Sequence, residues 1–520
     1  MTKFNTLFII LLAIFGSDGY RILAVFPFNS RSHNIFLEGV SRGLANRGHQ
    51  VDVISHFEMK NPPKTLKTIV NLHGTRANLM NNFTIEFASQ LGSDLVPFIA
   101  KLYGNELCEL MGLEKFQKFL RNLLHYDAVV TEAFGANCFM GLGHILKNAP
   151  VIAVATTLEY SWISDAVRNP DSTAFAPNVL LDSDISTFWD RLKNTIVTEL
   201  SKFRFYIYTK EAQTKAMRKY LRPNMPNIRE VERSVALTLV NSFHSIFGIR
   251  IRSPGFIDIA GIHIEDNDDK LSLDLQKWMD ESKDGVVYFT LGSMVIIETL
   301  SKETLLAIYA SFSKIAPIRV LLKVVDAKKL PPNLPKNVRT SKWIPQIPVL
   351  RHNNTRLFIM HGGLMGIEEA IYYGVPLIGM PIYGDQFSNV RIVVKKNMAV
   401  RMDYRKITEQ TLDKALKTVL TNPLFRESAK YESRLFRDRP MTATETTNFW
   451  VEYVIRNGPE VFKSPAIDMY WWQIALLDVY IFILLCFVLI IYLTIFIVKY
   501  AFSLFFRTLG DRQLKNKKKQ

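Results

Sequence analysis

The chain has 520 residues, of which 48% are hydrophobic and 22% charged, and its formal net charge is +16. This length suggests at least two domains, and the composition is that of a globular protein with membrane-like segments added. Outside the C-terminal tail the positive charge is spread along the chain, without a basic helix carrying interleaved aromatic residues, which argues against nucleic-acid binding. The three cysteines and the lack of a zinc-like Cys or His cluster exclude a disulfide scaffold and predict no metal site.

Residues 1–19 have the pattern of a secretory signal peptide. Lys3 precedes an uninterrupted apolar run, Leu7 to Phe15, and small or turn-forming residues follow it. The run is too short to span a bilayer, whereas a basic start, a short apolar core and small residues are typical of a cleaved leader. We therefore expect the mature chain to begin near Tyr20.

Residues 20–260 are predicted to form a Rossmann-like domain. A strand, a helix from about Asn34 to Asn46 and a second strand follow one another directly, and this unit builds a parallel sheet with right-handed crossovers. Further apolar runs of strand length follow, with a helix beginning near Asn137 between them. The expected strands are Arg21–Pro27, Gln50–Ser55, Asp127–Thr131 and Val151–Ala155.

Residues 261–455 are predicted to form a second Rossmann-like domain, with a boundary around residues 245–285. A helix is expected from about Lys302 to Ile315, and turn signals follow each apolar run. Ligands of open parallel sheets bind beyond the carboxyl ends of the strands, so two substrates would meet in the cleft between the halves. The expected strands are Gly285–Leu291, Arg319–Lys323, Leu357–Met360 and Leu377–Met380.

The C-terminus is predicted to anchor the chain in a membrane. A juxtamembrane segment, 456–473, ends in aromatic residues and leads into a transmembrane helix, 474–498, whose residues 479–498 carry no charge. Residues 499–520 form a basic tail, which is cytoplasmic by the positive-inside rule. The sequence thus predicts a single-pass type I protein in contact with membrane lipid, with the domains before the helix in the lumen.

Smaller signals concern the compartment. Lys517 and Lys518, near the end of the chain, resemble a dilysine retrieval signal and indicate the endoplasmic-reticulum membrane; the alternative is an ordinary basic flank. Asn82 and Asn353 begin glycosylation sequons that a luminal domain can use. One disulfide between the two cysteines outside the span is allowed in an oxidising lumen, but their spacing does not demand it. The sequence does not distinguish a monomer from a homo-oligomer.

Segment 357–386 carries the pattern that points most directly to chemistry. Its strand runs into His361, Gly362 and Gly363, and a helix follows at once. Such a turn offers free backbone N–H groups and the positive end of a helix to a diphosphate, and its glycines let the phosphates approach closely. Within that helix, the carboxylate of Glu369 can accept both hydroxyls of a ribose.

Further polar and aromatic residues stand on both sides of this segment. Trp343 and Gln346 precede the glycine turn, and Asp385 and Gln386 follow the helix. In this order they closely resemble the signature of the UDP-glycosyltransferase family, which includes the UDP-glucuronosyltransferases. The resemblance covers nearly the whole chain, including its layout of leader, enzyme, single span and lysine tail, and is most specific over residues 285–455. Two further matching motifs are Gly292-Ser293-Met294 and Asp438-Arg439-Pro440.

The resemblance implies an α/β protein with the GT-B fold, in which two Rossmann-like domains face a cleft and the C-terminal domain binds a UDP-sugar. It implies no metal and no cofactor, because the UDP-sugar is a co-substrate. Leu364 and Met365 depart from the family, which often has Asn there against the phosphate, so backbone amides would serve instead. By position, the resemblance assigns uracil stacking to Trp343, ribose contacts to Gln346 and Glu369, diphosphate binding to Ser293, His361, Gly362, Gly363 and Gly366, and sugar contacts to Asp385 and Gln386.

The first half must supply a base for the acceptor hydroxyl. His33 lies just after the first strand, and an imidazole, with a pKa of about 6.5, can take a proton at neutral pH when a carboxylate orients it. In the family that the sequence resembles, this histidine is the base, and an Asp after a later strand is its partner. Glu132 stands at the matching position here, and Asp127, at the start of its strand, is the alternative. We expect His33 and Glu132 to form the catalytic pair.

These assignments predict an inverting transferase that moves a hexose from a UDP-sugar to a hydroxyl of a small lipophilic acceptor. Glucose is favoured over glucuronate, because invertebrate-like members generally use UDP-glucose and no residue clearly supplies a cation for a glucuronate carboxylate. Residues 56–120 and 156–235, rich in Phe, Tyr, Leu and Met, are expected to line the acceptor pocket. The alternative is that they pack the domain or lie against the membrane.

Other classes of protein share parts of this pattern. A dinucleotide-dependent oxidoreductase would carry Gly-x-Gly-x-x-Gly after the first strand, where residues 28–33 contain no glycine. A second alternative is a catalytically silent relative that binds nucleotide-sugars or lipophiles. The presence of His33 argues against it, whereas Glu132 in place of the family's Asp leaves it as an alternative. Asp182 and Asp184 match the Asp-x-Asp of metal-using transferases, but they lie in a polar, loop-like stretch and this spelling recurs by chance.

Overall fold

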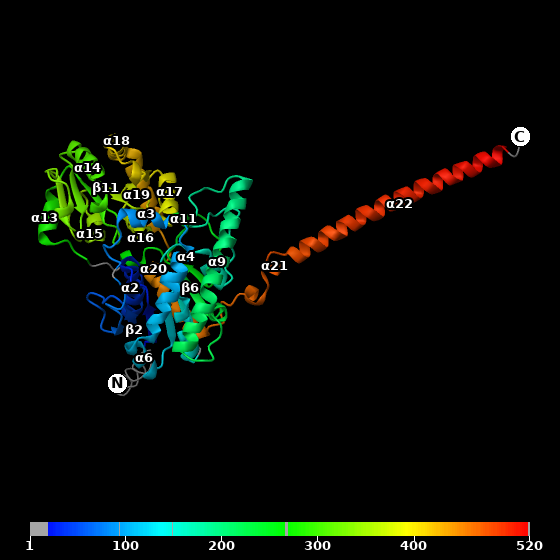
Figure 1. Cartoon of the computed structure of the whole chain (residues 1–520), viewed down its shortest axis with the longest axis horizontal. Coiled ribbons are helices and arrows are strands. Elements are labelled where there is room, and N and C mark those ends of the chain that lie inside the picture. Colours follow the sequence, from blue (N-terminus) through cyan, green and yellow to red (C-terminus); the bar gives the residue numbers. More distant parts are fainter. Residues whose placement is uncertain (1–18, 78, 93, 148, 266–268, 518–520) are drawn as a thin grey trace, which may run out of the picture. The chain divides into compact units, whose positions relative to one another are not determined.

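A computed structural model gives the fold of two compact units, the first ending at Lys463 and the second beginning at Ser464. The first unit contains two parallel α/β sheets with their helices (Figure 1). The residues that the structure describes are 19–77, 79–92, 94–147, 149–265 and 269–517. The predicted signal peptide, apart from Gly19, and residues 518–520 of the predicted tail lie outside them.

The first sheet has seven strands in the order β3-β2-β1-β4-β5-β6-β7, and all neighbouring strands are parallel. This is the Rossmann winding, which runs outward from β1 to β3 and then reverses to continue from β4. Strands such as β5 (VIAVA) read as continuous apolar runs because they are buried on both faces. The strands are β1 (Arg21–Phe26), β2 (Gln50–Ser55), β3 (Leu66–Asn71), β4 (Ala128–Glu132), β5 (Val151–Ala155), β6 (Val235–Val240) and β7 (Phe256–Asp258).

The second sheet repeats this winding with six parallel strands in the order β10-β9-β8-β11-β12-β13. Its strand order reverses between β8 and β11, as that of the first sheet does between β1 and β4. Ligands of such sheets bind where the order reverses, beyond the carboxyl ends of the strands. The strands are β8 (Val286–Thr290), β9 (Arg319–Lys323), β10 (Val338–Ser341), β11 (Thr355–Met360), β12 (Leu377–Gly379) and β13 (Ala399–Arg401).

Helices connect the strands of both sheets (Figure 1). Those of the first half are α2 (Arg31–Asn46), α3 (Ile85–Leu91), α4 (Val96–Ala100), α5 (Glu106–Cys108), α6 (Glu114–Arg121), α7 (Leu142–Ile145), α8 (Ser161–Ala166), α9 (Phe188–Tyr220), α10 (Ile228–Arg233), α11 (His244–Phe247) and α12 (Ile262–Glu265). Those of the second half are α13 (Leu273–Glu281), α14 (Lys302–Lys314), α15 (Gln346–Arg351), α16 (Leu364–Tyr372), α17 (Gln386–Lys395), α18 (Glu409–Thr421), α19 (Pro423–Arg437) and α20 (Ala443–Asn457).

The last helix of the first unit, α20, crosses back to the first sheet. Val451 and Val454 belong to the same buried cluster as side chains of β1, β2 and α2. Glu452 pairs with Arg47 at the end of α2, with 2.8 Å between Oε1 and Nε. The second domain predicted for residues 261–455 therefore includes a helix that packs on the first sheet.

Residues 81–88 of the first half pack against the second sheet. The backbone N–H of Asn81 donates to the carbonyl of Ser293 at 2.8 Å, and Phe83 forms an isolated parallel bridge with Val295. Phe83 and Ala88 are buried in the hydrophobic cluster of the second sheet. The loop after β8, which carries Ser293, is thus held in place by the first half of the chain.

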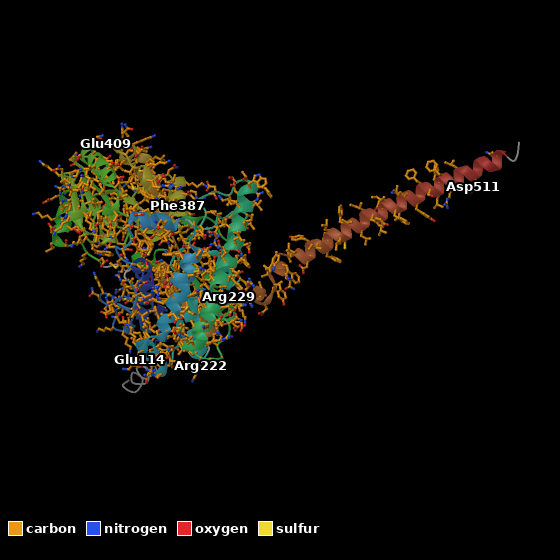
Figure 2. All side chains as sticks on the ribbon, viewed as in Figure 1. Glu114, Arg222, Arg229, Phe387, Glu409 and Asp511 are labelled. Atoms are coloured by element: carbon orange, nitrogen blue, oxygen red, sulfur yellow. A yellow bond between two sulfur atoms is a disulfide. The ribbon has the colours of Figure 1, made fainter. Side chains whose placement is uncertain are left out.

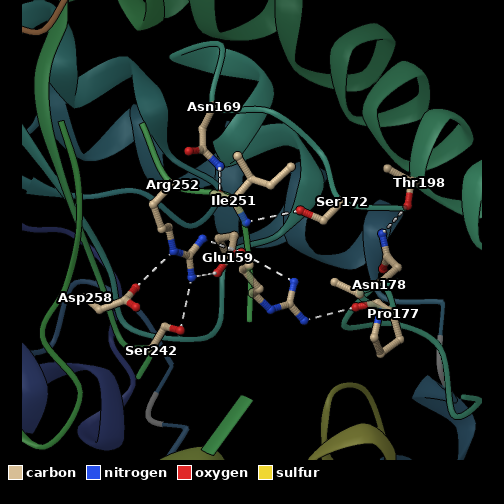
Figure 3. A network of polar contacts seen from close by, with 12 residues as sticks. Glu159, Asn169, Ser172, Pro177, Asn178, Thr198, Ser242, Ile251, Arg252 and Asp258 are labelled. Atoms are coloured by element: carbon tan, nitrogen blue, oxygen red, sulfur yellow. Dashed lines mark hydrogen bonds and ion pairs between the residues drawn. The ribbon is translucent and has the colours of Figure 1, made fainter. Parts of the chain in front are cut away.

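A buried ion network holds the loop after β5 (Figure 3). The carboxylate of Glu159 accepts from Arg252 Nη1 at 2.7 Å and lies 3.5 Å from Arg250 Nη1, and Arg252 Nε also donates to Asp258 at 3.1 Å. Burial alone would raise the pKa of Glu159, but the two guanidinium groups outweigh it and lower that pKa. The network fixes the segment that carries Tyr160.

Cys108 and Cys138 form a disulfide, with their Cα atoms 6.1 Å apart. The bond joins α5 to the turn after β4, and both cysteines are buried in the first half. The pairing that the spacing left open is therefore made, and such bonds persist in oxidising compartments.

The second unit contains α21 (Trp471–Ile474) and α22 (Leu477–Lys517). Within the described residues, α22 is the one helix long and apolar enough to cross a membrane, over Leu477–Asp511, and its apolar side chains are exposed (Figure 2). The helix does not end at residue 498 as the predicted span does. It continues into the basic tail as far as Lys517, and no proline interrupts it there.

Candidate active site

A cavity of about 1040 Å³ is lined by residues that follow the strands of both sheets. The points where the two strand orders reverse open into it, since His33 follows β1 and His361 follows β11. Of the predicted catalytic and donor-binding residues, all except Glu132 and Gly362 line this cavity. The structure therefore brings the predicted base, His33, and most of the predicted donor-binding residues to one cavity.

Two groups hold the imidazole of His33. Its Nδ1 lies 2.5 Å from Oε1 of Glu132 and 2.7 Å from Oγ1 of Thr156, and the Thr156 hydroxyl donates to the same Oε1 at 2.8 Å. An ionised carboxylate only accepts hydrogen bonds, so Nδ1 carries the hydrogen and Nε2 keeps its lone pair. Glu132 is buried behind His33, whereas His33 lines the cavity.

The alternative partner, Asp127, lies at the other end of β4. Its carboxylate accepts from the backbone N–H of Arg21 at 2.7 Å and from His125 Nε2 at 3.2 Å. Because β1 and β4 are parallel, their starts lie at one edge of the sheet and their carboxyl ends at the other. Arg21 and Asp127 are at the starts. Glu132 ends β4, and His33 follows the end of β1. Asp127 is therefore not the group that orients His33.

Aromatic rings surround His33 on the cavity wall. Phe28 and Phe134 meet the imidazole edge-on, with centroids 4.6 and 4.8 Å away, and stack on each other at 5.3 Å. Tyr103 lies 4.5 Å from Phe28, and Tyr160 lies 5.9 Å from Phe134. Flat apolar ligands bind well to such a wall.

The two ranges expected to line the acceptor pocket contribute unequally. Range 56–120 supplies many lining side chains, but range 156–235 supplies only Thr156, Thr157 and Tyr160. The long helix α9 instead carries exposed apolar side chains along its length. These are Phe188, Trp189, Leu192, Ile196, Leu200, Phe203, Tyr206 and Ile207.

The turn after β11 is built around the ring of His361. A Cβ at Gly292 or Gly363 would come within 2.5 or 2.7 Å of ring atoms, and Gly292 and Gly362 have φ of +84° and +90°. Only glycine suits these positions. Burial, and secondly the charge of Lys323, lowers the pKa of His361 to about 4. The imidazole is therefore neutral at pH 7 and offers a hydrogen bond, not a charge.

Helix α16 begins at this turn with its first N–H groups uncapped. Gly363 is the N-cap, no side chain caps it, and the first turn has no acidic residue. The first intrahelical bond runs from Ile367 N to Gly363 O, so the amides of Leu364, Met365 and Gly366 have no intrahelical acceptor. These amides and the helix dipole can hold an anion without the asparagine that the family often has.

Trp343 presents a half-exposed indole to the same cavity, with 44% of the residue exposed. Nearby, Gln346 Nε2 donates to Glu369 Oε2 at 2.6 Å, and Tyr288 Oη donates to Gln346 Oε1 at 3.3 Å. Glu369 is only 5% exposed, yet it lines the cavity. An aromatic face and an oriented carboxylate therefore line the same cavity as the glycine turn at His361.

Asp385 and Gln386 stand at the start of α17. Burial raises the pKa of Asp385, and a hydrogen bond from Asn389 Nδ2, at 2.8 Å, partly offsets this. The side-chain oxygen of Gln386 accepts from the N–H groups of Ile382 and Tyr383, at 2.9 and 3.1 Å. Gln386 thus supports the turn before α17, and its amide NH2 is the group left to meet a ligand.

Lys323, at the end of β9, is a site residue that the sequence analysis missed. Its Nζ donates to the carbonyl of Gly292 at 2.7 Å and to Asn81 Oδ1 at 2.8 Å, and lies 5.9 Å from the centroid of the Trp343 ring. Burial lowers its pKa to about 8. The sequence did contain a signal for it. Lys323 is the last residue of β9, after three apolar residues, and ligands bind at the carboxyl ends of such strands.

The Asp-x-Asp sequence makes ion pairs across the two halves. Asp182 pairs with Arg401 at 2.6 Å, and Asp184 pairs with Arg391 at 2.6 Å and Lys395 at 2.9 Å. Neither aspartate lines the cavity. Their role in the structure is to hold the loop before α9 against α17 and β13.

The two sequons differ in their surroundings. Asn82 is exposed, and the hydroxyl of Thr84 accepts from Phe87 N at the start of α3. Asn353 is also exposed, but Thr355 is buried and its hydroxyl donates to the carbonyl of Val349. Glycosylation at Asn82 and Asn353 stays a prediction.

Solved glycosyltransferase structures resemble the fold of this chain. The glycosyltransferase SnogD from Streptomyces nogalater aligns with a TM-score of 0.54 at 16% identity, over 84% of this chain and 99% of that one. The glycosyltransferase VinC, in complex with dTDP, aligns with a TM-score of 0.54 at 16% identity, over 84% of this chain and 100% of that one. The predicted GT-B fold is confirmed, and it is the fold of a class of glycosyltransferases.

Relatives in sequence identify the family within that class. A family model described as UDP-glucoronosyl and UDP-glucosyl transferase matches residues 22–512. UDP-glucosyltransferase 2 of Dactylopius coccus is 32% identical over 489 residues, 92% of this chain and 93% of that protein. UDP-glucuronosyltransferase 2B1 of Rattus norvegicus is 29% identical over 488 residues, 89% of this chain and 90% of that protein. The chain belongs to the UDP-glycosyltransferase family and is a UDP-sugar-dependent glycosyltransferase.

Proposed function

We propose that this enzyme transfers glucose from UDP-glucose to a hydroxyl of a small aromatic or lipophilic acceptor, with inversion and with His33 as the base. The observation that carries the proposal is the fixed orientation of His33. Glu132 and Thr156 hold Nδ1, which leaves Nε2 as the proton acceptor, and the ring lines the same cavity as the diphosphate turn.

The reaction is a direct displacement at the anomeric carbon. Nε2 of His33 takes the proton of the acceptor hydroxyl, and the acceptor oxygen forms a bond to that carbon from the side opposite UDP. The bond between the anomeric carbon and the diphosphate oxygen breaks, and its electron pair leaves with UDP. Glu132 stabilises the imidazolium that forms, as a buried carboxylate does beside a histidine base.

The departing diphosphate needs positive charge in a site with limited water. Because His361 is neutral, the charge comes from Lys323, and hydrogen bonds come from Ser293 and the free amides at the start of α16. Trp343 stacks on uracil, and Glu369 accepts the ribose hydroxyls with Gln346 beside it. These roles need no metal ion.

Glucose is the favoured sugar. Asp385, with the free amide of Gln386, suits neutral hydroxyls and would repel a second carboxylate. The other lining cations, Arg31, Arg42 and Lys60, lie in the first half, on α2 and after β2. The similarity to UDP-glucosyltransferase 2 supports glucose, and the similarity to UDP-glucuronosyltransferases keeps glucuronate as the second candidate.

The endoplasmic-reticulum membrane is the proposed location, with the catalytic unit in the lumen. The Cys108–Cys138 disulfide supports an oxidising compartment, and the apolar helix α22 followed by basic residues supports a cytoplasmic tail. The predicted signal peptide and the lysine motif predicted as a retrieval signal are in keeping with this proposal.

A donor panel tests the proposed substrate. UDP release is measured with a simple phenol and with UDP-glucose, UDP-glucuronate or UDP-N-acetylglucosamine. UDP-glucose is expected to give the highest kcat/KM. A higher value with UDP-glucuronate would support the second candidate. No UDP release above that of His33→Ala with any donor would indicate a binding protein without activity.

A further inference from the structure

A buried histidine from the first half lies against the two adjacent glutamates of α16. His263, on α12, has a side chain that is 0% exposed. Its Nε2 is 3.4 Å from Oε1 of Glu369, and its Nδ1 is 3.8 Å from Oε2 of Glu368. Neither ring nitrogen makes a hydrogen bond within the described part of the chain. The imidazole therefore meets a carboxylate oxygen at each nitrogen.

Glu368 is the unusual partner in this group. It is fully buried and makes no hydrogen bond of good geometry with the described residues, although Gly261 N–H and Asn241 lie near it. Burial raises the pKa of Glu368 well above its usual range, against the charge of Arg439. Unlike Glu369, it does not line the cavity, so a direct contact with substrate does not explain it.

The Glu369 carboxylate favours a hydrogen on Nε2 of His263, whether or not Glu368 is protonated. If both carboxylates are ionised, the nearer one, Glu369 at 3.4 Å, favours a hydrogen on Nε2, because an ionised carboxylate only accepts. If Glu368 is protonated, its Oε2, 3.8 Å from Nδ1, makes no hydrogen bond to the ring, and the carboxylate of Glu369 favours the tautomer with its hydrogen on Nε2. In both cases Nε2–H faces Oε1 of Glu369.

We infer that His263 is a positioning residue of the donor site, which holds the Glu369 carboxylate toward the ribose of the UDP-sugar. The inference rests on the ribose role proposed for Glu369. Gln346 holds Oε2 of this carboxylate at 2.6 Å, and His263 faces Oε1 at 3.4 Å. With both oxygens restrained, the orientation of the carboxylate is set before the nucleotide arrives, and less freedom is lost on binding.

The position of His263 is itself fixed by α2, the helix that carries the base. A Cβ at Gly39 of α2 would lie 3.0 Å from the carbonyl oxygen of Ile262 and 3.2 Å from Cα of His263, so α2 packs directly on the backbone of α12. The ring of Phe36, also on α2, lies 6.0 Å from the imidazole. One helix thus carries His33 in its first turn and supports His263 further along.

Binding of two nucleotides tests this role without relying on catalysis. Affinities for UDP and for 2′,3′-dideoxyuridine diphosphate are measured by calorimetry with the native protein, His263→Asn and His263→Gln. The Asn side chain keeps a polar group near Nδ1 but does not reach Glu369, whereas the Gln side chain can place an N–H near Nε2. His263→Asn is expected to weaken UDP by about 10- to 100-fold and the dideoxy nucleotide by less than about twofold. His263→Gln is expected to stay within about threefold of native for both.

Glu369→Gln separates this inference from the proposed function. It should lose the preference for UDP over the dideoxy nucleotide, and adding His263→Asn to it should cause no further loss, because both act on one interaction. If His263→Asn weakens both nucleotides equally, or neither, His263 does not position Glu369. If Glu369→Gln keeps the native preference, the ribose role of Glu369 fails and the inference falls with it. Melting temperatures confirm that each variant is folded.

Discussion

Nδ1 of His33 lies 2.5 Å from Oε1 of Glu132, although 99 residues separate them in the chain. The two meet because β1 and β4 are adjacent parallel strands, so that the first turn of α2, just after β1, and the last residue of β4 lie at one edge of the sheet. The longer Glu side chain, in place of the Asp common in the family, still reaches the imidazole. This geometry underlies the first prediction.

Replacing Glu132 with Gln is expected to lower kcat by about 100-fold or more, because an amide does not stabilise the imidazolium. Thr156→Val should have a smaller effect, about tenfold, because it removes one of the two groups that hold Nδ1. UDP release with saturating UDP-glucose and a phenol measures both effects. UDP affinity should not change, because both residues contact His33 and neither is a proposed donor-binding residue. Full activity in Glu132→Gln would show that this pair is not catalytic.

Trp343 is expected to bind uracil by stacking. Trp343→Ala should weaken UDP by about 10- to 100-fold, and Trp343→Phe should lose less, because a smaller aromatic face remains. The measurement is UDP affinity by calorimetry, with inorganic pyrophosphate as a control ligand that has no base to stack. If Trp343→Ala binds UDP like the native protein, the uracil lies elsewhere in the cavity.

The lowered pKa of Lys323 leads us to expect that UDP binding depends on pH. Burial lowers its pKa to about 8 in the free protein, and a bound diphosphate favours the charged form. Below about pH 7 the lysine is already charged, so binding takes up no proton there. Above about pH 8 the free protein must gain a proton on binding, so the Kd for UDP rises by up to about tenfold per pH unit. Calorimetry from pH 7 to 9.5 in buffers of different ionisation enthalpy measures this uptake.

Two controls isolate that effect. Lys323→Met should bind UDP more weakly at pH 7 and show no rise in Kd between pH 7 and 9.5. Uridine, which has no phosphate, should bind the native protein without this dependence. An unchanged pH profile in Lys323→Met would show that another group supplies the charge.

The Cys108–Cys138 disulfide should stabilise the catalytic unit. The two cysteines are 30 residues apart, and closing a loop of this length is worth about 3–4 kcal/mol in the chain-entropy account. Cys108→Ser with Cys138→Ser is expected to lower the denaturant midpoint in oxidising buffer. Cys486→Ser changes the free cysteine of α22 and serves as the control, with no expected shift. An equal midpoint for the double variant and the native protein would contradict this role.

The fold, and most of the predicted residues that line the cavity, could be identified from the sequence because each rests on a local pattern. β5, β8 and residues 357–360 of β11 are buried on both faces and therefore appear as short apolar runs, and the glycine turn at His361 can be recognised from its composition. The confirmed family assignment rests on the order of such local motifs. Strand β6 (VALTLV) has the same character, yet it was not predicted, and the short β7 and β13 carry little signal.

Contacts between distant segments could not be predicted in this way. Thr156 meets His33 across 123 residues, and Lys323 meets Asn81 across 242. Both contacts depend on which strands become neighbours and on how the two halves dock, which no single motif encodes. For the same reason, the packing of α20 on the first sheet was not predicted.

The role of His33 is tested most directly by comparing the native protein with His33→Gln and His33→Ala. With UDP-glucose and a phenol, we expect the native enzyme to release UDP and form a β-glucoside, the inverted product, as NMR of the anomeric proton can show. Both variants should bind UDP normally, yet lose about 100- to 10,000-fold in kcat, because neither side chain accepts a proton. Equal activity in the native protein and the variants, or an α-glucoside as the product, would contradict the proposed mechanism.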